Sequence, residues 1–163
     1  MKTIITLSAL TIAAAPPTIQ SPSYSIADIQ VHLYYQQSGA FDTANVTTDG
    51  ASILWNTDIG AGAAESPSGA ILILVKVRGN WLASSHGHRP HLKLVVQADS
   101  TRKVLHQETI GLDDFFSEQS FIWVPLIVLG TGCDHERISA ALLSPNGATQ
   151  SPLAKTVRFE CGE

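Results

Sequence analysis

Three of the six histidines of this 163-residue chain lie close together in the sequence HGHRPH. Imidazole nitrogens bind zinc and copper, which take about three or four ligands at about 2.0 to 2.1 Å. In an extended chain His86 and His88 point to one side and His91 to the other, so the three need a bend to reach one ion. Gly87 and Pro90 permit such a bend. The segment is therefore a candidate copper or zinc site, and the alternative is a solvated loop.

An aromatic side chain precedes this cluster in the same connection. Trp81 stands among Gly, Asn and Ser in RGNWLASSHGH and outside any alternating pattern, so we expect it to be exposed. Exposed Trp rings stack on sugars or anchor protein interfaces, and binding residues often sit on loops held by a rigid scaffold. The loop of residues 79–90 is therefore the preferred binding surface. Tyr34 and His32 share the outward side of a predicted strand and could extend it, whereas Trp55 and Trp123 fall within predicted strands and are expected in the core.

Catalytic motifs are scarce in the sequence. No nucleophile elbow, zinc-protease helix motif or phosphate-binding loop is present. The stretch from Ser100 to Lys103 has the form S-x-x-K, but that motif acts from a helix, and here it falls on a predicted hairpin turn. A small hydrolase stays open as a further alternative, although no spacing predicts the pocket with a perturbed carboxylate or histidine that it needs.

The two cysteines are placed symmetrically about a segment rich in turn residues. Cys133 and Cys161 flank LLSPNGATQSPLA, whose centre is Gly147. If 136–143 and 154–160 form a hairpin around that centre, the cysteines meet at its open end and form a disulfide, as is usual in exported proteins. The alternative is two free thiols in a reducing compartment.

The N-terminus has the outline of a secretory signal peptide. MKTIITLSALTIAAA combines an early lysine, a short apolar stretch and a run of small alanines. We expect residues 1–15 to be the signal and the Pro/Ser-rich residues 16–27 to be a flexible lead-in, the alternative being a buried N-terminal strand or helix. No stretch reaches the roughly 20 apolar residues of a membrane span. The chain is therefore expected to be secreted or periplasmic.

Charge argues against nucleic acid as a partner. The chain carries 10 Lys and Arg against 14 Asp and Glu, a formal net charge of −4, and its basic residues are scattered. Phosphate binding needs a clustered basic patch. An unidentified protein or glycan is the expected partner.

The rest of the chain reads as one β domain over residues 28–163. Apolar and polar residues alternate from Asp28 to Gln36, as in a strand with one buried face, and turn-rich connections separate further strand candidates. This pattern predicts an antiparallel β-sandwich of seven or eight strands with immunoglobulin-like architecture, although no Trp lies between the two cysteines. The other predicted strands are 51–56, 70–78, 91–98, 103–110, 120–129, 136–143 and 154–160.

These features favour an exported β-sandwich without catalytic activity that binds a macromolecular partner through loop 79–90. The first alternative is an exported copper- or zinc-binding protein that uses His86, His88 and His91. The second is the small hydrolase.

Overall fold

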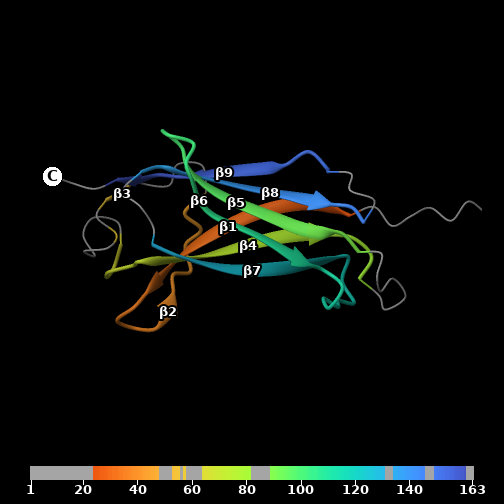
Figure 1. Ribbon diagram of the computed structural model, residues 1–163. Helices are drawn as coiled ribbons and strands as arrows, with labels where there is room; N and C mark the ends of the chain where they lie inside the picture. Colours follow the sequence, from red (N-terminus) through yellow and green to blue (C-terminus); the bar gives the residue numbers. More distant parts are fainter. Residues whose placement is uncertain are drawn as a thin grey trace, which may run out of the picture.

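Two four-stranded antiparallel sheets and one two-stranded parallel sheet make up the described part of the chain (Figure 1). The structure is a computed structural model, and it describes residues 24–47, 53–55, 57, 64–81, 89–130, 134–145 and 149–160. The expected signal peptide and most of the lead-in lie outside these residues. The strands are β1 (Ser25–Tyr35), β2 (Ala40–Phe41), β3 (Leu54–Trp55), β4 (Ala70–Arg78), β5 (His91–Ala98), β6 (Val104–Gly111), β7 (Phe121–Leu129), β8 (Glu136–Leu143), β9 (Leu153–Val157) and β10 (Phe159–Glu160).

One sheet has the order β2-β1-β4-β7 and the other β6-β5-β8-β9. Strand β1 contacts β8 and β9 across the core, so β7 and β6 lie at the same side of the molecule. The predicted all-β antiparallel sandwich is confirmed, while the immunoglobulin-like detail stays a prediction. A short parallel pair of β3 and β10 forms a separate two-stranded sheet, in which the Leu54 N–H donates to the Arg158 carbonyl over 2.8 Å.

Alternation along the strands builds the core. The inward residues of β1, β4, β5, β7 and β8 are almost all aliphatic and buried. Burial of these side chains supplies the main stabilising free energy, at about 25 cal/mol per Å² of apolar surface. The side chains with no exposed surface in the two central strands of each sheet are Ile29, Val31, Ile71, Ile73, Val75, Val77, Leu92, Leu94, Val96, Ile138, Ala140 and Leu142.

Several details differ from the sequence-based expectation. The described residues form ten strands and not seven or eight, because the short β2 was not predicted and the predicted strand 154–160 is divided into β9 and β10. β1 begins at Ser25, so the last residues of the expected lead-in belong to a strand. Trp55 is exposed, because its neighbour Leu54 takes the inward position of β3 and Trp55 points to the other side. Trp123 is half-buried on the outward side of β7, since its neighbours Ile122 and Val124 take the inward positions. Neither Trp belongs to the core.

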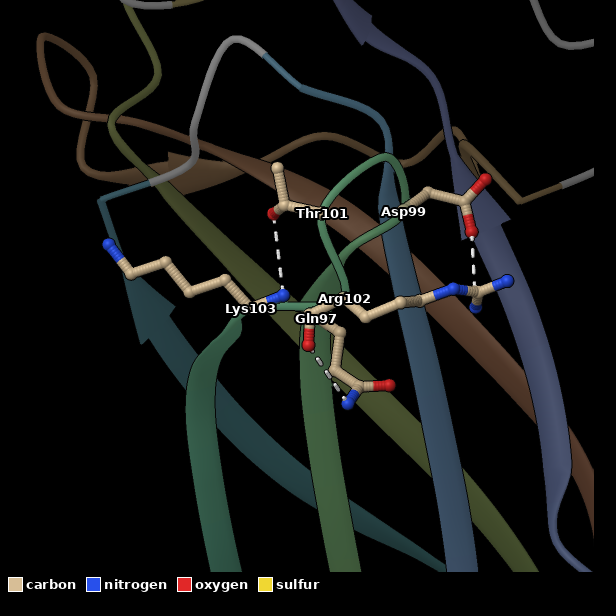
Figure 2. Close-up of polar contacts among 5 residues, drawn as sticks. All are labelled: Gln97, Asp99, Thr101, Arg102 and Lys103. Atoms are coloured by element: carbon tan, nitrogen blue, oxygen red, sulfur yellow. Dashed lines mark hydrogen bonds and ion pairs between the residues drawn. The ribbon is translucent and has the colours of Figure 1, made fainter.

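The turn between β5 and β6 confirms that the S-x-x-K stretch lies on a hairpin and not on a helix (Figure 2). The Ala98 N–H donates to the Lys103 carbonyl over 3.0 Å, and the Arg102 N–H donates to the Ala98 carbonyl over 2.9 Å. Arg102 has a φ of 60°, the left-handed conformation that such turns require at one position. The Arg102 guanidinium lies 3.6 Å from the Asp99 carboxylate.

Within the described residues no helix is found, and therefore none with the length and apolarity to cross a membrane.

Candidate functional site

The outward side of β7 carries an uninterrupted apolar row, which we call the β7 face. It consists of Phe121, Trp123, Pro125, Ile127 and Leu129, whose inward neighbours fill the core. Ile127 is 56% exposed and Leu129 is 77% exposed. Single exposed apolar residues are ordinary, but a contiguous row on one strand is typical of an interaction surface.

The neighbouring strand continues this surface. Leu72 lies opposite Ile127 and Leu74 opposite Pro125 on β4, and both leucines are half-buried on the outward side. The basic side chain that follows them covers one end of the row, since Lys76 Nζ lies 4.0 Å from the centre of the Phe121 ring and 5.2 Å from that of Trp123. Because of this cation–π contact, the Phe121 end of the β7 face carries a positive charge, whereas the Leu129 end is apolar.

Tyr34 and His32, the predicted binding residues on β1, lie on the same outward side of the same sheet. His32 is opposite Leu72, and Tyr34 is opposite Ala70. The Tyr34 ring packs on Phe41 with 5.0 Å between ring centres, and His32 Nδ1 lies 3.0 Å from the Asp42 carbonyl. Both side chains are half-buried and continue the surface of the β7 face across the sheet.

The expected exposure of Trp81 is wrong, since only 1% of it is exposed. Tyr24 packs against its ring with 5.1 Å between ring centres, and the Arg89 guanidinium lies 5.5 Å from the ring centre on the β5 side. The burial of Trp81 could not be predicted from its neighbours in sequence, because Tyr24 lies far away in the chain. Trp81 therefore belongs to the hydrophobic core and offers no exposed ring for a ligand.

Arg89 is the unexpected partner in this contact and is itself only 2% exposed. Its Nη1 donates to the carbonyls of Leu112, Asp113 and Phe115, and its Nη2 donates to the Trp81 carbonyl over 3.2 Å. Both described ends of loop 79–90 are thus fixed in the protein, and the segment that follows β6 is fastened to the same guanidinium. Residues 82–88 lie outside the described part of the chain.

The histidine cluster can be placed only in part. His91 begins β5 as an exposed residue on the outward side of its sheet, whereas His86 and His88 lie outside the described residues. No group of three or more His, Cys, Asp or Glu side chains in the described ranges is arranged to hold a metal ion. The copper or zinc site stays a prediction.

A shallow depression of about 320 Å³ lies at one end of the sandwich. His135 Nε2 lies 3.2 Å from Glu160 Oε1 in its wall, and both side chains are partly exposed. Such a contact between accessible side chains contributes little free energy, about 0 to 1 kcal/mol. The residues that line the depression are Asp99, Ser100, Asp134, His135, Phe159 and Glu160.

The predicted hairpin between the two cysteines is present, although Cys133 and Cys161 themselves lie outside the described residues. β8 pairs with β9 in antiparallel register from Glu136 opposite Val157 to Ala140 opposite Leu153. Beyond the last pair of this ladder, Glu136 and Val157, the side chains of His135 and Glu160 are also in contact. The disulfide stays a prediction.

The β7 face was missed because FIWVPLIVL is apolar at every position, a pattern that reads as a strand buried on both faces. One signal could have corrected this. Pro125 cannot donate a hydrogen bond, so proline in mid-strand indicates an edge strand, and an edge strand is more often open to solvent.

Neither a family model nor a curated protein matches the chain.

Proposed function

We propose that this chain is an exported binding domain that holds a macromolecular partner on the outward side of the β2-β1-β4-β7 sheet, centred on the β7 face. The observation that carries the proposal is the row of five apolar side chains on β7, backed by Leu72 and Leu74. Water contact with such a row is unfavourable by about 25 cal/mol per Å², so covering it with a partner gives a driving force.

A protein partner fits this surface better than a glycan. Glycan platforms use aromatic rings with free faces, but the Phe121 and Trp123 rings are covered by Lys76, and Tyr34 packs on Phe41. The most exposed members of the row, Ile127 and Leu129, are aliphatic. Aliphatic side chains complement other aliphatic side chains, as at the buried centre of a protein interface.

The loop of residues 79–90 stays a second candidate surface, now without Trp81 as an anchor. Export rests on the composition of residues 1–15 and on the two cysteines. A disulfide between Cys133 and Cys161 would hold the open end of the β8–β9 hairpin and would stabilise the fold by about 3 kcal/mol in the chain-entropy model. Thiol titration of the unfolded, unreduced protein should find no free thiol, and Cys133→Ala should expose one at Cys161.

Site-specific photo-crosslinking in the producing cells tests the binding surface. A benzophenone amino acid at Leu129 should give an adduct with another macromolecule on illumination. The same group at Thr156, an exposed position on β9, is the matched control and should give none. Equal adducts at the two positions, or no adduct at Leu129, would rule out the β7 face as the binding surface.

A further inference from the structure

The two edges of the β2-β1-β4-β7 sheet differ in whether their outward backbone groups are hydrogen-bonded. On the β1 side the segment after β2 satisfies the outer backbone groups: the Val46 N–H donates to the Val31 carbonyl over 2.9 Å, and the Val31 N–H donates to Asn45 Oδ1 over 3.0 Å. The Asp42 N–H donates to the Leu33 carbonyl over 2.8 Å. On the other side, no strand among the described residues pairs with the outer edge of β7.

The register shows which groups point to that open edge. The Gly79 N–H donates to the Ser120 carbonyl and the Gly130 N–H to the Gly69 carbonyl, so residues 120 and 130 occupy hydrogen-bonded positions opposite β4. The β4–β7 register runs between them without a shift. Hydrogen-bonded positions alternate in an antiparallel pair, so the even-numbered residues of β7 bond to β4 and the odd-numbered residues direct their N–H and C=O outward.

The odd-numbered residues are also those of the β7 face. The outer edge therefore offers N–H donors at Phe121, Trp123, Ile127 and Leu129, and carbonyl acceptors at these residues and at Pro125. An edge of this length, with apolar side chains and no pairing strand among the described residues, is a template for another strand. Pro125 has no N–H, so one donor is missing near the middle.

The opposite sheet leaves room for an added strand. β6 lies on the same side of the sandwich as β7, and its residues opposite the buried Leu92, Leu94 and Val96 of β5 are Ile110, Glu108 and His106. None of these three β6 side chains is fully buried. Inward positions of a sandwich are usually buried, so no strand in the described part of the chain fully covers the inner side of β6, and a strand added to β7 would face it.

Size argues for one added strand over a second sandwich docked face to face. Nine residues at about 3.3 Å and two strands at about 4.8 Å make the apolar surface of β7 and β4 about 30 by 10 Å, or about 300 Å². A stable dimer interface usually buries about 800 Å² on each partner, of which about 55 to 65%, or about 450 to 500 Å², is apolar. The area is therefore small for a dimer of this chain.

Pro125 argues against a second copy at the edge itself. In a twofold pairing of β7 with β7 both copies contribute Pro125, so two donors are missing from a ladder of nine residues. A segment without proline at this point leaves only one donor missing. Pairing with such a segment therefore loses one backbone hydrogen bond, whereas pairing with a second copy loses two.

We propose that the outer edge of β7 binds an extended segment of a different protein by strand addition, with apolar side chains of that segment lying beside the β7 face. This inference deepens the proposed function and rests on it. Backbone hydrogen bonds give affinity in this mode of recognition, and alternate side chains give specificity.

Two substitutions at one position separate strand addition from packing on the face. Ile127→Pro removes an outward N–H and keeps an apolar side chain, and the β4 ladder is untouched because Ile127 does not bond to β4. Ile127→Ala removes most of the side chain and keeps the N–H. Circular dichroism and urea unfolding establish that both variants fold.

The probe is a phage-displayed library of random linear 12-residue peptides, selected against the full chain. Selected peptides should bind with at least tenfold lower affinity to Ile127→Pro and with less than about fivefold lower affinity to Ile127→Ala. They should also slow amide hydrogen exchange at Phe121, Trp123, Ile127 and Leu129. Both results together support strand addition.

Four outcomes would overturn it. They are the absence of any selected peptide, binding that survives Ile127→Pro and is lost in Ile127→Ala, a wild-type chain that sediments as a dimer with these amides protected, and a peptide-free monomer in which they are already protected. The last two would identify a second copy or a segment of the same chain as the occupant. Crosslinking at Leu129 reports a partner on the β7 face whether or not it binds by strand addition. The proposed function and this inference can therefore fail separately.

Discussion

The Arg89 guanidinium stacks on the indole of Trp81, 5.5 Å from the ring centre, while the Trp81 carbonyl accepts a hydrogen bond from Arg89 Nη2. The two residues mark the described ends of the connection between β4 and β5. One buried cation therefore joins that connection to the segment after β6, where Leu112, Asp113 and Phe115 supply carbonyl acceptors.

Arg89→Lys should lower the free energy of unfolding by about 2 to 4 kcal/mol. An ammonium lacks the planar fork that reaches these carbonyls together, and acceptors left unpaired in the interior are costly. Urea unfolding measures the change. Arg78→Lys is the matched control, because Arg78 is exposed at the end of β4 and should change stability by less than about 0.5 kcal/mol. Equal effects of the two substitutions would show that Arg89 does not hold the loops.

Gly79→Ala should destabilise the protein by about 1 to 3 kcal/mol, the range for overpacking a filled site. A Cβ at Gly79 would lie 2.1 Å from Cδ1 of Tyr24, whose ring packs against Trp81 and whose hydroxyl donates to the Asn80 carbonyl. Thermal unfolding followed by circular dichroism measures the loss.

The control for that substitution is Gly111→Ala. A Cβ at Gly111 would meet the His91 ring at 3.8 Å, an ordinary contact, so little change is expected. A melting temperature for Gly79→Ala equal to that of Gly111→Ala would mean that Tyr24 moves aside without cost.

Alternation along the chain was enough to predict most of the sandwich. Ile29, Val31 and Leu33 are buried as the period of two requires, and β8 and β9 pair in antiparallel register as predicted. These features depend on neighbours in sequence, which the sequence displays directly.

The features that sequence could not supply depend on contacts between distant segments. Trp81 looked exposed from its Gly, Asn and Ser neighbours, but Tyr24 and Arg89 cover it. Likewise, Trp123 on β7 was expected in the core, and only the packing of the two sheets shows that its side of the strand faces outward. Tyr34 and His32 were assigned to the outward side correctly, but the surface they join lies on strands far along the chain.

Arg102→Gly should be more stable than Arg102→Ala by about 1 kcal/mol. The left-handed φ of 60° costs an alanine about 1 to 2 kcal/mol and costs glycine little, while glycine loses part of this advantage to its greater freedom in the unfolded chain. Both substitutions remove the contact with Asp99, an exposed ion pair, so their difference isolates the backbone conformation (Figure 2). Paired urea unfolding curves measure it, and equal midpoints would contradict a strained Arg102.

Asp42 should make the fold sensitive to acid. Partial burial acts to raise its pKa, but hydrogen bonds from the Ala44 N–H, the Tyr35 hydroxyl and the Thr43 N–H, together with the nearby His32, hold the pKa below its ordinary value of 3.8. The Tyr35 hydroxyl donates to Asp42 Oδ2 over 2.6 Å and ties the turn after β2 to β1.

A carboxyl group with a lowered pKa in the folded state contributes stability that is complete above pH 3.8 and is lost as the pH falls through the folded value. Asp42→Asn keeps an acceptor for Tyr35 but cannot titrate, so its unfolding free energy should fall less steeply below pH 3.8 than that of the wild type. Urea unfolding at a series of pH values between 2 and 7 measures the two slopes. Parallel profiles would show that Asp42 is no more acidic in the folded protein than in the unfolded chain, and that its contacts with Tyr35 and Ala44 stabilise the protonated and ionised forms equally.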